Sequence, residues 1–204
     1  MSIRPLFTAA ALGCIVLTTS ASAQTSDSAA APVHAARTSG WEFLMTSGAV
    51  VPTGAQRNAI TSGQMSAAQL TYVVRPSIAI TATTGWARTK DIASAGDPKL
   101  DIFTYDLGAE IRGTRWNDGG KLTFRPFTGV GAGARSYNYR NLNVDATHNV
   151  AAYGSMGGDL GIRRVQLRLE ARDYVTGFKP LAGVGTADTR NDFVMMVGLR
   201  LATR

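Results

Sequence analysis

The segment Val165-Gln166-Leu167-Arg168-Leu169-Glu170-Ala171-Arg172-Asp173-Tyr174 alternates between apolar and polar side chains. Because successive side chains of a β-strand point to opposite faces, this alternation predicts a strand with one apolar face and one charged face. Arg168, Glu170 and Arg172 are spaced to pair with each other or with neighbouring strands. If the apolar face contacts lipid, a one-residue slip would place both arginines in hydrocarbon, at roughly 2–4 kcal/mol each near the midplane.

The same two-residue period recurs along the chain and predicts eight antiparallel strands. These strands cover residues 41–50, 66–74, 78–88, 101–113, 122–139, 150–162, 165–174 and 192–203. The predicted connections alternate between long loops and short turns. The loops are residues 52–64, 89–100, 141–149 and 176–191, and the turns are residues 75–77, 117–120 and 163–164. Seven hairpins of this kind place all long loops at one end of a meander, which is typical of outer-membrane barrels.

The N-terminal residues predict export. Arg4 precedes an apolar or small stretch over Leu6–Thr19, and Ala21-Ser22-Ala23 is a small-residue cleavage site, so residues 1–23 are predicted to be a signal peptide. Residues 24–40, rich in Ala, Ser, Thr and Pro, are predicted to be a flexible periplasmic leader, which leaves residues 41–204 as the barrel domain. Leu12-Gly13-Cys14 is a faint alternative cleavage site of lipoprotein type. Cys14 is the only cysteine, so cleavage after Ala23 predicts a chain with no disulfide.

Composition narrows the classes of partner. The 204 residues carry a formal net charge of +7, which becomes +6 when Arg4 leaves with the signal peptide. A basic balance suits nucleic acid, anionic lipid or anionic glycans, and export argues against nucleic acid. No segment after residue 23 has about 18 consecutive apolar residues, so no transmembrane helix is predicted.

Alternation alone does not separate a lipid-facing barrel from a soluble ligand-binding barrel, and three features favour lipid. The polar face carries glycines, which leave room for long side chains in a narrow interior: Gly108, Gly129, Gly131, Gly133, Gly157 and Gly161. Aromatic residues gather near strand ends, as in interfacial girdles: Trp41, Trp116 and Phe124 at the turns, and Trp86, Phe103, Tyr137 and Tyr174 at the loops. The polar face also carries charges of both signs, which buried positions tolerate only in pairs. They predict an interior charge network of Glu42, Asp106, Glu110, Arg112, Arg125, Asp159, Arg168, Glu170 and Arg200.

A family resemblance adds to this interpretation. The signal peptide, the eight alternating strands and the segments Pro126–Gly133 and Leu167–Tyr174 resemble the small outer-membrane β-barrel proteins of the OmpA/OmpX-like kind, over residues 41–204. The resemblance implies an eight-stranded, antiparallel, up-and-down transmembrane barrel in the outer membrane of a Gram-negative bacterium. It also implies recognition by the barrel assembly machinery.

The sequence predicts a lipid contact rather than a catalytic site. Basic and aromatic residues at the loop ends are expected to bind lipopolysaccharide phosphates and headgroups: Arg135, Tyr137, Tyr139, Arg140, Arg172, Tyr174 and Lys179. A catalytic arrangement of His148 with Asp145 and Ser155 is the weaker interpretation, since a solvated loop histidine explains His148 much better. No metal-ligand spacing and no nucleotide loop is found, so no cofactor is predicted.

We therefore expect a monomeric outer-membrane barrel with a structural or surface-interaction role, a closed polar lumen and no enzymatic activity. Two alternatives stay open at this point. One is a barrel enzyme that modifies lipids of the outer leaflet, and the other is a soluble periplasmic barrel that binds a small ligand.

Overall fold

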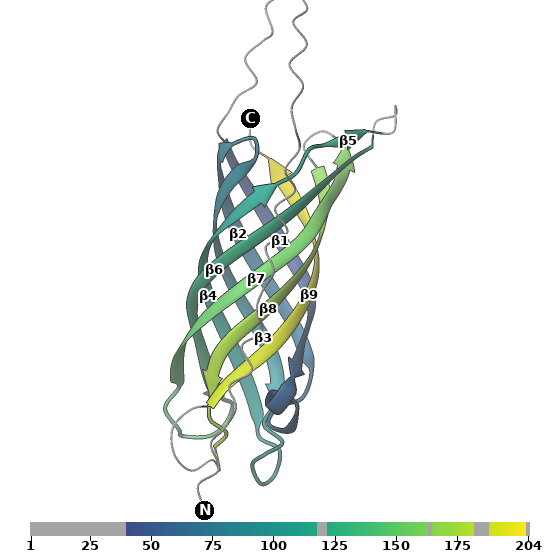
Figure 1. Cartoon of the computed structure of the whole chain (residues 1–204). Helices are drawn as coiled ribbons and strands as arrows, with labels where there is room; N and C mark the ends of the chain where they lie inside the picture. The colour runs from purple at the N-terminus through teal and green to yellow at the C-terminus, as the bar shows by residue number, and fades with distance from the viewer. Residues whose placement is uncertain (1–39, 118–121, 163–164, 182–187, 203–204) are drawn as a thin grey trace, which may run out of the picture. The chain divides into compact units, whose positions relative to one another are not determined.

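The computed structural model describes residues 40–117, 122–162, 165–181 and 188–202. The predicted signal peptide and nearly all of the predicted leader, with Cys14 and His34, lie outside the described residues. The described part forms a closed antiparallel β-barrel of eight long strands (Figure 1). The long strands are β1 (Gly40–Thr53), β2 (Gly63–Arg75), β3 (Ile78–Lys90), β4 (Lys99–Arg112), β6 (Thr123–Tyr139), β7 (Thr147–Ile162), β8 (Val165–Phe178) and β9 (Asp188–Ala202). The short elements are the 3₁₀ helix η1 (Gly54–Asn58) and the two-residue strand β5 (Trp116–Asn117).

The barrel is an up-and-down meander that closes between its first and last strands. Each long strand pairs with its neighbours in the chain, and β4 pairs with β6 because β5 adds only to the edge of β6. The seam between β1 and β9 runs from Glu42 opposite Ala202 to Thr53 opposite Asn191. A closed barrel of this kind leaves no long strand with an unpaired edge.

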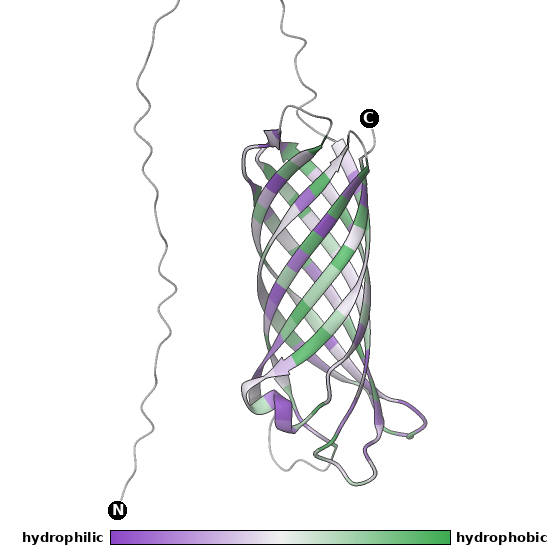
Figure 2. Ribbon diagram, turned by 90° about the vertical axis from the view of Figure 1, so that its right-hand side faces the viewer, coloured by the Kyte–Doolittle hydropathy of each residue, from purple (hydrophilic) through white to green (hydrophobic). Residues whose placement is uncertain are grey.

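The two faces of each strand meet different surroundings. In β8, Leu167 and Leu169 are exposed, at 39% and 57%, whereas Arg168 and Glu170 between and beside them are buried, at 0% and 5%. The same alternation of apolar and polar positions runs along the other strands (Figure 2). The apolar rows therefore form the outer surface and the charged rows point inward.

Strand boundaries differ from the predicted ones mainly at the loop ends. Pairing of β8 with β9 extends to Phe178 opposite Asp188, so the last loop is shorter than the predicted 176–191. At the other end, β4 ends at Arg112 and β6 begins at Thr123. Trp116 and Asn117 between them form β5, which pairs with Phe124 and Thr123 of β6. No helix within the described ranges is long and apolar enough to cross a membrane.

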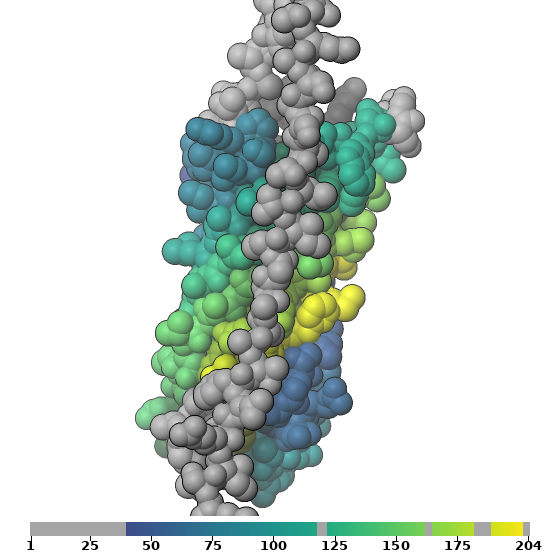
Figure 3. Space-filling model, viewed as in Figure 1, coloured from purple at the N-terminus to yellow at the C-terminus, as the bar shows by residue number. Residues whose placement is uncertain are grey.

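The interior has two chemically different parts. Apolar and aromatic side chains gather inside the barrel near the ends of the strands that lead to the long loops, among them Met65, Leu100, Tyr137 and Phe178. The charged side chains lie nearer the short turns. Side chains fill the spaces that the ribbon drawing leaves between strands, as the space-filling view shows (Figure 3).

Candidate functional site

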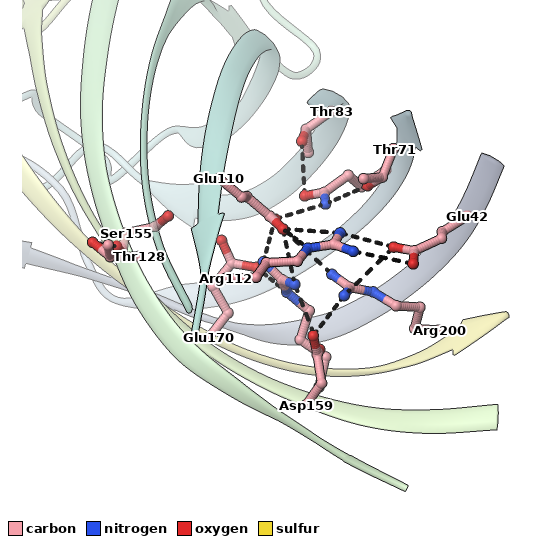
Figure 4. A network of polar contacts seen from close by, with 12 residues as sticks. Glu42, Thr71, Thr83, Glu110, Arg112, Thr128, Ser155, Asp159, Glu170 and Arg200 are labelled. Atoms are coloured by element: carbon pink, nitrogen blue, oxygen red, sulfur yellow. Dashed lines mark hydrogen bonds and ion pairs between the residues drawn. The ribbon is translucent and has the colours of Figure 1, made fainter. Parts of the chain in front are cut away.

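The candidate site is the inward-facing charge network. The strands place five buried arginines inside the barrel together with six carboxylates, so the described interior charges nearly cancel. Figure 4 shows the part of this network that contains Glu42, Glu110, Arg112, Asp159, Glu170 and Arg200. The arginines are Arg112, Arg135, Arg168, Arg172 and Arg200, and the carboxylates are those of Glu42, Asp106, Glu110, Asp159, Glu170 and Asp192. An arginine removed from water is tolerable only when its charge and its N–H groups are matched, and this near balance meets that requirement.

The part of the network nearest the turns joins β1, β4, β7 and β9. Arg112 holds Glu42 with two parallel bonds, from Nη1 at 3.1 Å and from Nη2 at 2.8 Å, and its Nε donates to Glu110 at 3.2 Å. Arg200 Nη1 donates to Asp159 at 2.5 Å. Bidentate arginine–carboxylate pairs fix geometry as well as charge, so these contacts tie the first and last strands to the middle of the sheet.

Arg168 is the hub of the network. Its Nε donates to Glu170 at 2.8 Å, its Nη2 donates to Glu110, and its Nη1 lies 3.5 Å from Asp159. Its guanidinium carbon also lies 3.4 Å from the ring centroid of Phe127, within cation–π range. The side chain therefore engages all three nitrogens while it is fully buried.

A second group of contacts lies nearer the middle of the barrel around Arg172. Arg172 donates to Glu170 at 2.5 Å and to Gln69 at 2.7 Å. Its Nη1 lies 3.6 Å from Asp106, which also accepts a 2.6 Å bond from the Tyr174 hydroxyl. Gln69 extends the group by donating to Glu110 at 3.3 Å, so the two groups of contacts form one network.

Arg135 forms a separate layer between the network and the apolar part of the interior. It pairs with Asp192 of β9, and its guanidinium lies 4.1 Å from the ring centroid of Tyr174. Both members of the pair are at most 1% exposed. Replacing either one alone would leave the other charge buried without its counter-ion.

Glycines on the inward face make room for the rings that line this network. A Cβ at Gly131 would lie 2.4 Å from the ring of Tyr153, and one at Gly108 would lie 2.2 Å from its hydroxyl. Tyr153 in turn lies 4.7 Å under the guanidinium of Arg172 and 5.3 Å from the ring of Tyr174. The predicted reason for the glycine-rich polar face, space for long interior side chains, matches these contacts.

Comparisons with known proteins find solved structures that are similar to this chain. No family model and no curated protein matches the chain. The crystal structure of Neisserial surface protein A (NspA) has a TM-score of 0.55 at 12% sequence identity, and the match covers 79% of this chain and 95% of that one. Two others have TM-scores of 0.49. They are the N-terminal β-barrel domain of Pseudomonas aeruginosa OprF, at 8% identity over 80% of this chain and 98% of that one, and E. coli Outer Membrane Protein W, at 17% identity over 82% and 100%.

The chain has the fold of the small outer-membrane β-barrels. Three observations support this assignment: the similarity to NspA, the eight paired strands and the apolar outer surface. It confirms the fold that the sequence resemblance implied. At such low identity the likeness concerns the fold alone.

The structure corrects the prediction that a loop-end cluster of basic and aromatic residues contacts lipopolysaccharide. Five of its residues point into the interior and are at most 6% exposed: Arg135, Tyr137, Tyr139, Arg172 and Tyr174. They lie on the same rows as the interior glycines and charges, because they share the inward parity of β6 and β8. Only Arg140 and Lys179 keep partly exposed side chains, and Arg140 is bound to Asp101.

Arg125 and two of the girdle residues also differ from the prediction. Arg125 lies at the turn-end rim, where it donates to the backbone carbonyl oxygens of Gly113, at 3.1 Å, and Pro76 rather than to a carboxylate. It is outside the charge network because the strand reaches water at that point. Of the predicted aromatic girdles, Tyr137 and Tyr174 are interior residues, whereas Trp41 and Trp116 are exposed.

The weaker catalytic interpretation finds no geometric support. His148 is exposed near the start of β7 and Ser155 is buried on the opposite face of the same strand. Seven residues of extended strand separate them by about 23 Å. Within the residues that the structure describes, no group of three or more His, Cys, Asp or Glu side chains could hold a metal ion.

Two acidic residues that the sequence analysis did not single out are central to the interior. Asp192 is the partner of Arg135. Asp91, in the loop between β3 and β4, is fully buried and accepts bonds from the Tyr139 hydroxyl at 2.6 Å and from the Leu181 amide at 2.9 Å. Asp192 lies on the inward-facing row of β9, so its burial could have been predicted from the alternation. Asp91 lies in a loop, where there is no alternation to show which way a side chain points.

Proposed function

We propose that the chain is an outer-membrane β-barrel of a Gram-negative bacterium, with a structural and surface-contact role and a filled, non-conducting interior. One observation supports this most strongly, namely that large apolar side chains are exposed along the outside of the barrel while five arginines are buried in its interior. Leu107, Val130 and Met156 are each at least 66% exposed. Such a surface suits hydrocarbon and would be unfavourable in water, which argues against the soluble ligand-binding alternative.

The filled interior is supported by what occupies it at each level. The charge network crosses the barrel near the turns, the Arg135–Asp192 pair follows, and the apolar cluster lies near the loops. At the loop end, Gln56 of η1 is fully buried, and Ile92 N donates to Ala59 O at 2.9 Å. An eight-stranded barrel has an interior just wide enough for side chains to fill, so we expect no open channel.

The surface-contact role is supported by the loops. Apolar side chains are exposed in three of the loop-end connections, at Ile92, Leu142, Val144 and Leu181, with exposures of 41–43%. Exposed apolar groups next to a membrane surface suit contact with another molecule. As partners we propose lipopolysaccharide and other outer-membrane lipid around a monomeric barrel that the barrel assembly machinery inserts.

The decisive test of the membrane assignment is the mobility of the protein in SDS gels. A closed lipid-facing barrel resists SDS, so the unboiled and boiled outer-membrane fractions should give bands at different apparent sizes. The protein should also stay with the membranes after a salt wash. Release by osmotic shock, without a change in mobility on boiling, would contradict the proposal and favour the soluble barrel.

Conductance tests the filled interior separately. Purified protein inserted into a planar lipid bilayer should give no stepwise current, because both parts of the interior are occupied by side chains. The control is the same preparation checked by its heat-dependent mobility, which shows that folded barrel was added. Reproducible conductance steps from folded protein would refute the filled interior while leaving the membrane barrel in place.

A further inference from the structure

The outer surface of the barrel carries a groove that the interior network does not explain. It has a volume of about 930 Å³ and runs over β1, β2, β3, β4 and β9. Two smaller hollows adjoin it, one of about 300 Å³ toward the turns and one of about 190 Å³ toward the loops. We refer to the main hollow as the outer groove.

Register explains why the outer groove exists. Its floor consists of small outward-facing side chains that lie opposite one another: Ser47 faces Ser66 across β1 and β2, and Ala68 faces Thr84 across β2 and β3. Larger side chains form the two walls, which are Trp86, Phe103 and Tyr105 on one side and Met45, Val197 and Leu199 on the other. Small residues aligned across three strands between large ones produce a depression along the barrel wall.

The loop end of the outer groove is basic. The guanidinium carbon of Arg88 lies 4.0 Å from the ring centroid of Trp86, and Arg88 lines the hollow that adjoins the groove there. Lys90 and Lys99 lie directly opposite each other across β3 and β4, both exposed. Arg140 adds a further positive charge, and Asp101, which it binds, supplies a negative one.

The lysine pair suggests what this end of the groove binds. Like charges directly opposite each other destabilise a strand pair. Within the part of the chain that the structure describes, neither Lys90 nor Lys99 forms an ion pair. An anion between or beside the two ammonium groups would remove the repulsion, and a phosphate with Arg88 nearby would also gain charge-assisted hydrogen bonds.

We propose that the outer groove binds a phosphate-bearing anionic lipid of the surrounding bilayer, with an acyl chain along the floor and the phosphate at Arg88, Lys90 and Lys99. This inference rests on the proposed membrane function. The arrangement of residues along β3 matches that of a lipid, with an apolar part followed by a charged part. The apolar wall of the groove ends at Trp86, and the next outward-facing residue of β3 is the base Arg88. Basic side chains at the loop end would face the outer leaflet, where they attract anionic headgroups.

Quenching of Trp86 fluorescence tests the proposal. The variant Trp41→Phe, Trp116→Phe keeps Trp86 as its only tryptophan. It is refolded into phosphatidylcholine vesicles that contain a small fraction of either phosphatidylglycerol or phosphatidylcholine with brominated acyl chains, which quench on contact. Phosphatidylglycerol should reach half-quenching at a lower mole fraction, by about fivefold for each lysine that contributes, because a surface base is worth about 1 kcal/mol.

Matched variants separate charge from shape. Lys90→Gln with Lys99→Gln should lower the preference for phosphatidylglycerol by up to about 25-fold, since Arg88 remains, whereas Arg75→Gln, at the turn end of β2, should leave it unchanged. Ser66→Leu fills the floor and should weaken quenching by the anionic lipid. Gly154→Leu adds the same bulk to the outer face of β7, where a Cβ has no neighbour within 4 Å, and should have no effect.

The experiment separates failure of the groove proposal from failure of the membrane assignment. Heat-dependent mobility in SDS shows first whether each variant has inserted and folded. Equal half-quenching fractions for the two brominated lipids in an inserted barrel would overturn the groove proposal alone. Failure of the parent protein to insert would overturn the proposed membrane function and the groove proposal together.

Discussion

Arg168 shows how one buried side chain depends on several distant ones. Its carboxylate partners come from β4, β7 and from its own strand, so no single contact accounts for its burial. Desolvating a guanidinium costs several kcal/mol, which its partners offset only as a set. The energetic role of the residue therefore belongs to the network.

We predict that Arg168→Met lowers the free energy of unfolding by about 3–5 kcal/mol, because it leaves carboxylates buried with fewer counter-charges. Urea unfolding of the protein in lipid vesicles measures the change. The matched control is Arg125→Met, which removes an arginine of the turn-end rim whose acceptors are backbone carbonyl oxygens. That control should cost about 1 kcal/mol or less. Equal effects of the two substitutions would contradict the role assigned to the network.

At the level of single residues, the face of the strand on which a side chain lies was predictable from sequence, whereas its interaction partners were not. The inward direction of Arg168 and Glu170 follows directly from the alternation of β8. The same parity places Arg135, Tyr137 and Tyr139 inside, and the prediction of a lipid contact for them overlooked it. The alternation does not show how far along the barrel axis a residue lies. Arg125 shares the inward-facing row of these residues but lies at the rim of the barrel.

At the level of elements, the loop between β3 and β4 is fixed by a buried carboxylate. The Asp91 side chain accepts bonds from the backbone amides of Ala93 and Ser94, at 3.0 and 3.1 Å, and from the Ser94 hydroxyl at 2.8 Å. Its bonds from Tyr139 and Leu181 join this loop to β6 and to the chain after β8. One side chain thus holds the beginning of the loop to two other parts of the barrel.

We predict that Asp91→Asn loosens this loop, because an amide supplies one acceptor oxygen where the carboxylate uses two. Hydrogen bonds to charged groups contribute roughly 1.5–3 kcal/mol each, so backbone amides of residues 92–97 should exchange hydrogen at least tenfold faster. Hydrogen exchange read by mass spectrometry provides the measurement. The control is Asp97→Asn in the same loop, where the side chain is exposed. Unchanged exchange in Asp91→Asn would show that other contacts hold the loop.

Element boundaries were less predictable than element number. Eight alternating segments were visible because each has one apolar face, whereas the last residues of β8 and the first residues of β9 continue to pair where the pattern fades, at Gly177 opposite Thr189. The turn-end extension at β5 depends on contact of Trp116 with Phe124, whose ring centroids are 5.6 Å apart. That contact is a tertiary one, and local sequence carries no signal for it.

At the level of the whole molecule, the apolar exterior separates a membrane barrel from a soluble one. We predict that Leu169→Arg, near the middle of the apolar row of β8, impairs insertion at a cost of about 2–4 kcal/mol. Folding yield in vesicles, read from heat-dependent mobility, measures it. Val165→Arg, at the turn end of the same row, should cost at most about 1 kcal/mol. A soluble barrel would tolerate both substitutions, so equal yields would count against the membrane assignment.

The charge pairs that cross the barrel also constrain the order of events during folding. Arg112 of β4 finds Glu42 in β1, and Arg168 of β8 finds Glu110 in β4, so the partners are distant in the chain. An open sheet lying in the bilayer would turn these arginines toward hydrocarbon without their partners, at roughly 2–4 kcal/mol each. We therefore expect partly inserted intermediates to be poorly populated. We also expect closure of the seam between β1 and β9 to accompany the crossing of the membrane in one kinetic step.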